Sequence, residues 1–99
     1  MRVLFAAAAV VLTACGNSVA PGASFERYSY TNESGTRTYK VYVPTGVQAK
    51  AAMPLIVELH GCGGNADEEA RWSRFNALAD AHGFLAVYPE QDAAANGSR

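Results

Sequence analysis

The residue types best suited to chemistry stand together in one glycine-rich segment, His60-Gly61-Cys62-Gly63-Gly64. Its three glycines let the backbone take positive φ angles and bring main-chain N–H groups close to a ligand. Such N–H donors stabilise the negative charge that develops on an ester carbonyl oxygen during acyl transfer. The segment is therefore predicted to be a loop that can bind an anionic group.

This loop must be positioned by the segment before it, residues 55–59, which reads Leu-Ile-Val-Glu-Leu. An almost continuous run of apolar residues is typical of a strand that is covered on both faces, as in a parallel sheet. Glu58 interrupts the run, and burying its carboxylate without a partner would cost several kcal/mol. We expect this carboxylate to find a partner or to face the edge of the sheet, and we assign it no catalytic role.

A helix is predicted to follow the loop. Asn65 and Glu68 have the spacing of a capping box, and the acidic residues 67–69 fall in the first turn, where the helix dipole favours negative charge. Gly83 is predicted to end this helix as its left-handed cap residue. The helical spacing predicts a buried face made of Trp72, Phe75, Leu78, Ala79 and His82, with Arg71 and Arg74 directed to solvent.

The remaining segments predict an α/β fold. Residues 84–89 form the next strand, parallel to the first. Upstream, residues 25–44 hold two runs of alternating β-forming residues on either side of an Asn-Glu-Ser-Gly turn, which predicts an antiparallel hairpin. The hairpin is thus followed by a parallel βαβ unit. Four of the five tyrosines lie in the hairpin, where we interpret them as cross-strand packing, with a carbohydrate-stacking surface as the alternative.

The start of the chain has the features of a targeting segment. Arg2 supplies a positive charge, and the apolar run at residues 3–12 is too short to span a bilayer. Residues 1–14 are predicted to be a lipoprotein signal peptide, because small residues and Cys15 directly follow this run, and Cys15 is the predicted lipidation site. An ordinary secretory signal that contains a cysteine is the alternative. Residues 15–24, rich in Gly, Ser, Asn and Pro, are predicted to be a flexible tether.

The net charge and the small number of possible metal ligands argue against nucleic acid and metal ions as partners. The chain has 8 Lys and Arg against 9 Asp and Glu, a net charge of −1, and no basic cluster that would bind nucleic acid. His60 and Cys62 are too few to hold zinc, so neither a metal nor a cofactor is expected. Neither His60 nor His82 is expected to act as a general base, because His82 falls in the last helical turn and His60 precedes the glycines.

Three motifs carry a resemblance to a known family: HGCGG at residues 60–64, HGF at 82–84 and VYPEQ at 87–91. Residues 54–91 resemble the secreted polyhydroxybutyrate depolymerases and the feruloyl or acetyl-xylan esterases. This resemblance implies the N-terminal portion of an α/β-hydrolase, an exported serine esterase that acts on a polyester or a plant cell-wall ester. It also implies that the N–H groups of Cys62 and Gly63 belong to an oxyanion hole, while His60 and Gly61 orient the loop.

The same resemblance places the catalytic serine, acid and histidine after the oxyanion loop, beyond Arg99. It also implies a disulfide partner for Cys62 beyond Arg99, whereas a catalytic thiol at Cys62 would need a base nearby. Residues 25–99 are therefore expected to be a truncated hydrolase domain, with no catalytic residue and no esterase activity of its own. A non-catalytic envelope lipoprotein and a fragment of a decayed gene are the alternatives.

Overall fold

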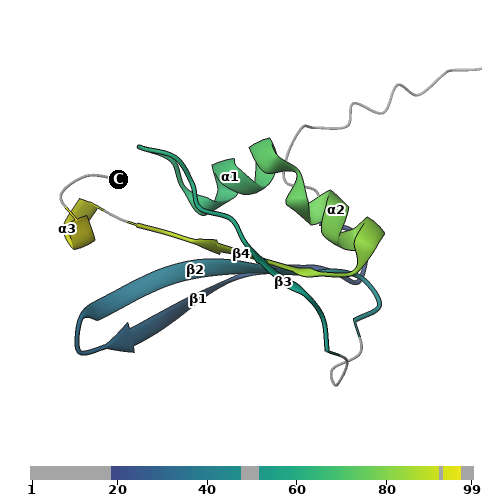
Figure 1. The fold of residues 1–99 in the computed structure, drawn as a ribbon, viewed down its shortest axis with the longest axis horizontal. Helices are drawn as coiled ribbons and strands as arrows, with labels where there is room; N and C mark the ends of the chain where they lie inside the picture. The colour runs from purple at the N-terminus through teal and green to yellow at the C-terminus, as the bar shows by residue number, and fades with distance from the viewer. Residues whose placement is uncertain (1–18, 48–51, 92, 97–99) are drawn as a thin grey trace, which may run out of the picture.

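The computed structural model describes residues 19–47, 52–91 and 93–96. Four strands form one sheet, and two helices lie on one side of it (Figure 1). The elements in chain order are β1 (Ser24–Asn32), β2 (Gly35–Val43), β3 (Leu55–Val57), α1 (Ala66–Ser73), α2 (Phe75–His82), β4 (Leu85–Pro89) and the short α3 (Ala93–Asn96). The predicted signal peptide and Cys15 lie outside the described residues. None of the helices in the described ranges is long and apolar enough to cross a membrane.

Strands β1 and β2 form the predicted antiparallel hairpin. Their register pairs Asn32 with Gly35, which leaves a two-residue connection between the strands. The Asn32 side chain accepts a hydrogen bond from the Ser34 N–H at 2.9 Å, and Gly35 takes a φ of +115°, which is open to glycine. Across the strands, the rings of Tyr28 and Tyr39 stack with their centroids 5.7 Å apart, as predicted for cross-strand packing.

Strand β4 lies inside the sheet, whose strand order is β1-β2-β4-β3. It is antiparallel to β2 and parallel to β3, so that Val87 stands opposite Val41 on one side and Val57 on the other. The predicted parallel pair is thus confirmed. Because β3 and β4 are parallel neighbours, their carboxyl ends meet at the same edge of the sheet, and the segments that follow them lie close together.

The core lies between the sheet and the helices and is centred on Tyr42 and Tyr88, both fully buried. Their hydroxyls donate hydrogen bonds to α2, from Tyr42 to Asp80 at 2.6 Å and from Tyr88 to Asn76 at 2.7 Å. Phe25 packs edge-on against both tyrosine rings. These bonds satisfy hydroxyls that burial removes from water, and they hold α2 against β2 and β4.

The prediction of one continuous helix is wrong, because the chain forms two helices that meet at Arg74. Arg74 is left-handed, with a φ of 60°, and its N–H ends α1 by donating to the carbonyl of Ala70 at 3.2 Å. Because Arg74 is not helical, the 3.6-residue spacing of side chains along α1 does not continue into α2. Both predicted caps are confirmed: the Asn65 side chain accepts from the Glu68 N–H at 3.0 Å, and Gly83 ends α2 with a φ of 71°.

The predicted buried helical face is consequently correct only in part. Ala79 is buried and Phe75 half-buried, whereas Trp72, Leu78 and His82 are exposed, Trp72 to 77%. Arg71 and Arg74 are exposed as predicted. The side chains that the two helices do bury are small, namely Ala66, Ala70, Asn76 and Ala79. Two large tyrosines already fill the space above the sheet, so the helices can approach it closely only with small residues.

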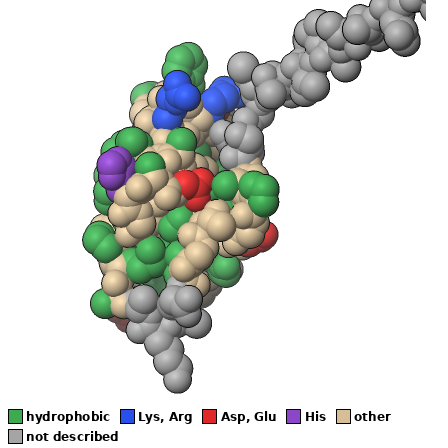
Figure 2. Space-filling model, turned by 90° about the vertical axis from the view of Figure 1, so that its right-hand side faces the viewer, with side chains coloured by type: hydrophobic (Ala, Val, Ile, Leu, Met, Phe, Trp, Pro, Cys, Tyr) green, Lys and Arg blue, Asp and Glu red, His purple; other side chains and the backbone are tan. Residues whose placement is uncertain are grey.

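Strand β3 differs from the predicted strand with two covered faces. It is a three-residue edge strand within the described part of the sheet. The exposed fractions of Leu55, Val57 and Leu59 are 57%, 53% and 73%. Both helices lie on the other side of the sheet, so these alternating side chains face away from them (Figure 1). Figure 2 shows hydrophobic side chains at several places on the face turned to the viewer.

The predicted tether is described only from Val19 onward. The N–H of Ala23 donates to the carbonyl of Ala20 at 2.9 Å and closes a turn, and Ser24 already belongs to β1. The hydroxyl of Thr45, which follows β2, donates to the carbonyl of Pro21 at 3.3 Å. The end of the predicted tether therefore contacts the segment that leaves the hairpin.

The buried tyrosines predict a loss of stability in alkali. Burial raises the pKa of both Tyr42 and Tyr88 from 10.0 to about 12, and the hydrogen bond to Asp80 adds to the effect at Tyr42. Between these values the unfolded chain binds fewer protons than the folded one, so stability is complete below pH 10 and declines as the pH rises to about 12. Urea unfolding across this range should therefore give a falling free energy of unfolding.

The matched variants are Tyr42→Phe and the exposed Tyr30→Phe. Tyr42→Phe should flatten the alkaline decline because it removes one of the two buried tyrosines whose pKa is raised, and its effect should exceed that of Tyr30→Phe, which removes a tyrosine that is 61% exposed. Equal slopes in both variants would contradict the assignment.

Candidate functional site

The glycine-rich loop leaves the carboxyl end of β3 and runs into α1. The N–H of Gly64 donates to the carbonyl of Gly61 at 3.0 Å and closes a tight turn. Gly63 takes a φ of +76°, a conformation that strains any residue with a Cβ. A Cβ on Gly64 would lie only 3.2 Å from the same carbonyl oxygen of Gly61. Glycine is therefore favoured at residue 63 by backbone conformation and at residue 64 by the close approach of the Gly61 carbonyl.

Cys62 and Gly63 occupy the middle of this turn and are exposed. Within the residues that the structure describes, the N–H groups of Cys62 and Gly63 have no hydrogen-bond acceptor, because the turn uses the N–H of Gly64. Two adjacent main-chain donors are thus available for a hydrogen bond to a ligand. The thiol of Cys62 is free and exposed.

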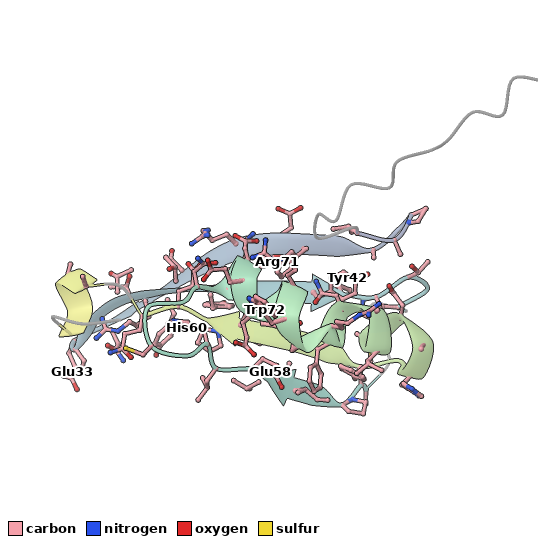
Figure 3. All side chains as sticks on the ribbon, turned by 90° about the horizontal axis from the view of Figure 1, so that it is seen from above. Glu33, Tyr42, Glu58, His60, Arg71 and Trp72 are labelled. Carbon is pink, nitrogen blue, oxygen red and sulfur yellow. The ribbon has the colours of Figure 1, made fainter. Side chains whose placement is uncertain are left out.

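The ring of His60 joins the start of the loop to the segment after β4 (Figure 3). Its Nδ1 lies 2.8 Å from the carbonyl oxygen of Gly61, and its Nε2 lies 3.2 Å from the backbone nitrogen of Gln91. Since the N–H of Gln91 can only donate, Nε2 is the acceptor, and Nδ1 carries the proton that it donates to Gly61. Both ring nitrogens are occupied within the protein, so His60 is placed to hold the loop and not to take a proton from a nucleophile.

An open cavity of about 340 Å³ lies at the carboxyl ends of β3 and β4, beside the loop. It is lined by Arg37, Leu59, His60, Pro89, Glu90 and Gln91. Ligands of sheets with parallel strands bind outside the carboxyl ends of those strands, and the mixture of apolar and polar lining is typical of small-molecule sites. Of the residues in the glycine-rich segment, only His60 lines this cavity.

One other titratable group, Glu58, directly follows β3 and precedes the loop. Glu58 has a raised pKa, first because it is partly buried and then because the charge and a hydrogen bond of Glu69 disfavour its ionised form. The Glu58 side chain is half-buried. No group of three or more His, Cys, Asp and Glu side chains within the described ranges is arranged to hold a metal ion.

Sequence reasoning assigned no role to Glu90 or Gln91, which contact both sides of the loop. Their position directly after β4 could have pointed to them, because the carboxyl ends of the parallel strands β3 and β4 must lie side by side. Only the register of β4 shows which of the residues after the strand reach the loop.

Comparison with known proteins identifies the family. Residues 37–99 match the family model described as "Esterase PHB depolymerase". This chain belongs to the esterase PHB depolymerase family. The match contains β3, the loop, both helices and β4, so it covers the entire site described above.

The relatives in this family are named as ester hydrolases. The chain is 35% identical to poly(3-hydroxyalkanoate) depolymerase C from Paucimonas lemoignei over 97% of its own length and 22% of that protein. It is 41% identical to feruloyl esterase B from Neurospora crassa, over 60% of the chain and 19% of that protein. The chain thus spans about a fifth of the length of these relatives.

A solved structure supports the fold independently. The feruloyl esterase module from Clostridium thermocellum, in an S954A mutant complexed with sinapinate, matches 74% of this chain and 29% of its own with a TM-score of 0.57 and 20% identity. The chain accordingly has part of an α/β-hydrolase fold, as the sequence motifs implied.

The loop geometry predicts unequal effects of alanine at two of its glycines. Gly63→Ala should destabilise the protein by about 1–2 kcal/mol, because it forces a side chain into the left-handed region. Gly61→Ala is the matched control, since a Cβ there meets no other atom within 4 Å and no positive φ is required. Denaturant unfolding of both variants measures the difference. Equal losses would contradict the geometry of the turn.

Proposed function

We propose that this chain supplies the oxyanion-binding loop of a serine esterase. The observation that carries the proposal is the pair of unpartnered N–H groups at Cys62 and Gly63, on a turn that His60 holds in place. Membership of the esterase PHB depolymerase family supports it. The catalytic serine, acid and histidine would belong to residues outside this chain.

The proposed reaction is acyl transfer in two steps. A serine hydroxyl attacks the ester carbonyl carbon, and the carbonyl oxygen becomes negative in the tetrahedral intermediate. The N–H groups of Cys62 and Gly63 donate to this oxygen and stabilise its negative charge. Expulsion of the alcohol leaves an acyl-enzyme, which water then hydrolyses.

The substrate class follows from the names of the relatives. They are a poly(3-hydroxyalkanoate) depolymerase, feruloyl esterases and acetylxylan esterases, so we include a polyester or a plant cell-wall ester in the proposal. Such substrates are polymers outside the cell, and an exported enzyme would meet them there. The apolar run at residues 3–12 followed by Cys15 supports export with a lipid anchor on the cell envelope.

Proline at residue 62 tests the oxyanion role, because it removes the backbone N–H that the proposal requires. Cys62→Pro in the full-length protein should lower kcat for a p-nitrophenyl ester by about 100- to 1000-fold, the usual loss for one oxyanion donor. Cys62→Ala is the control, since it keeps the N–H and removes the sulfur, together with any disulfide that Cys62 forms in the full-length protein. It should retain activity.

Three outcomes would argue against this function. Full activity in Cys62→Pro would exclude the donor role, and loss of activity in Cys62→Ala at an unchanged unfolding midpoint would favour a catalytic thiol. The 99-residue chain should have no esterase activity that a serine-directed inhibitor can abolish. Inhibitor-sensitive turnover by this chain would place the nucleophile within it. Unfolding midpoints of both variants separate catalytic loss from loss of fold.

Cys15 tests the lipid anchor. When the protein is expressed in bacteria that are supplied with a labelled fatty acid, it should incorporate the label. Cys15→Ser should abolish the incorporation, because the lipid is attached to the sulfur atom of Cys15. Cys62→Ser is the matched control and should remain labelled. Label that persists in Cys15→Ser would exclude this lipidation site.

A further inference from the structure

The Glu90 carboxylate joins the sheet to the first helix. One of its oxygens, Oε2, accepts hydrogen bonds from the hydroxyl of Thr38 at 3.0 Å and from the Arg27 guanidinium. The other, Oε1, accepts from the backbone N–H of Ala66, the first residue of α1, at 3.4 Å. The Glu90 side chain is only 13% exposed, so these partners replace most of its contact with water.

The surrounding charges are balanced. Arg27 also lies 3.9 Å from the carboxylate of Asp67, and Lys40 contacts the same carboxylate at 2.5 Å. Two cationic side chains of the hairpin, Arg27 and Lys40, therefore contact two carboxylates. Glu90 directly follows β4, and Asp67 lies in the first turn of α1. Negative charge at the start of a helix is favoured by the helix dipole, so this arrangement stabilises α1 in its present position.

The adjacent residue, Gln91, holds the other side of the loop. Its N–H donates to Nε2 of His60, whose Nδ1 donates to Gly61. Gln91 thus contacts His60, immediately before the glycine turn, and Glu90 contacts Ala66, two residues after it. A turn of three glycines has little conformational preference of its own, so its shape must be set by the residues that hold its two ends.

We propose that Glu90 is a positioning residue that fixes the directions of the Cys62 and Gly63 N–H groups through the start of α1. Its catalytic consequence rests on the proposed esterase function, whereas its effect on the loop does not. The role is distinct from that of an ordinary surface ion pair. A surface pair contributes little to stability, while a displaced donor weakens the stabilisation of the transition state.

The test uses two variants and one control. Glu90→Ala removes all three contacts of the carboxylate. Glu90→Asp keeps the charge near Arg27 but shortens the side chain by one methylene, so that it can no longer reach both the sheet and Ala66. Glu33→Ala removes an equal charge from the exposed hairpin turn, away from α1 (Figure 3).

The first measurement needs no activity. With cysteine and glycine nitrogens isotopically labelled in the full-length protein, the amide resonances of Cys62 and Gly63 should shift and broaden in Glu90→Ala and Glu90→Asp, and should stay unchanged in Glu33→Ala. Unchanged resonances in both Glu90 variants would overturn the proposal. This result is independent of whether the protein hydrolyses esters.

The second measurement is kinetic. In the full-length enzyme, kcat for a p-nitrophenyl ester should fall by about 10- to 100-fold in both Glu90 variants with little change in KM, as expected when a catalytic group is displaced by about 1 Å. A lower unfolding midpoint with wild-type kcat would reduce Glu90 to a structural ion pair and overturn the proposal. If the wild-type protein has no activity but the resonances move, the esterase function fails while the positioning role stands. If Glu90→Ala does not fold, Glu90→Asp alone decides the question.

Discussion

The backbone pairing of β4 with two neighbours at once holds the other elements together. On one side β4 is antiparallel to β2 and so joins the hairpin, and on the other it is parallel to β3 and so joins the loop. Its buried residues Ala86 and Tyr88 face the helices. Because its carboxyl end emerges beside that of β3, the residues that follow it can contact the loop. The candidate site therefore depends on the register of one five-residue strand.

Glycine makes the loop both useful and dependent on its surroundings. It allows the positive φ at Gly63 and the close approach at Gly64, but it provides no side chain that could hold the turn. The rigid parts lie on either side: His60 is bonded to Gln91, and Asn65 caps α1. Such preorganisation matters in an oxyanion hole, where donors must point to the oxygen before its charge develops.

The two large buried tyrosines explain how the core is packed. They also explain why the buried helical face predicted from the sequence is only partly correct. Tyr42 and Tyr88 fill the space between the sheet and the helices, and their hydroxyls need partners there, which Asp80 and Asn76 provide. The residues that the helices bury fully are then small, whereas the larger Phe75 is only half-buried. Trp72 has the hydrophobicity of a core residue but points outward, because hydrophobicity alone does not say which face has room for it.

The sequence by itself determined the hairpin, the parallel pair, the Asn65 and Gly83 caps and the glycine loop, because each depends on short-range preferences and regular alternation. The family also followed from motifs within residues 54–91. Only the tertiary structure decided the break at Arg74, the exposure of β3 and the contacts of Glu90. These features depend on which segments, distant in the chain, lie against each other. Local propensity carries no information about such contacts, whereas strand register and the space left by the core determine them.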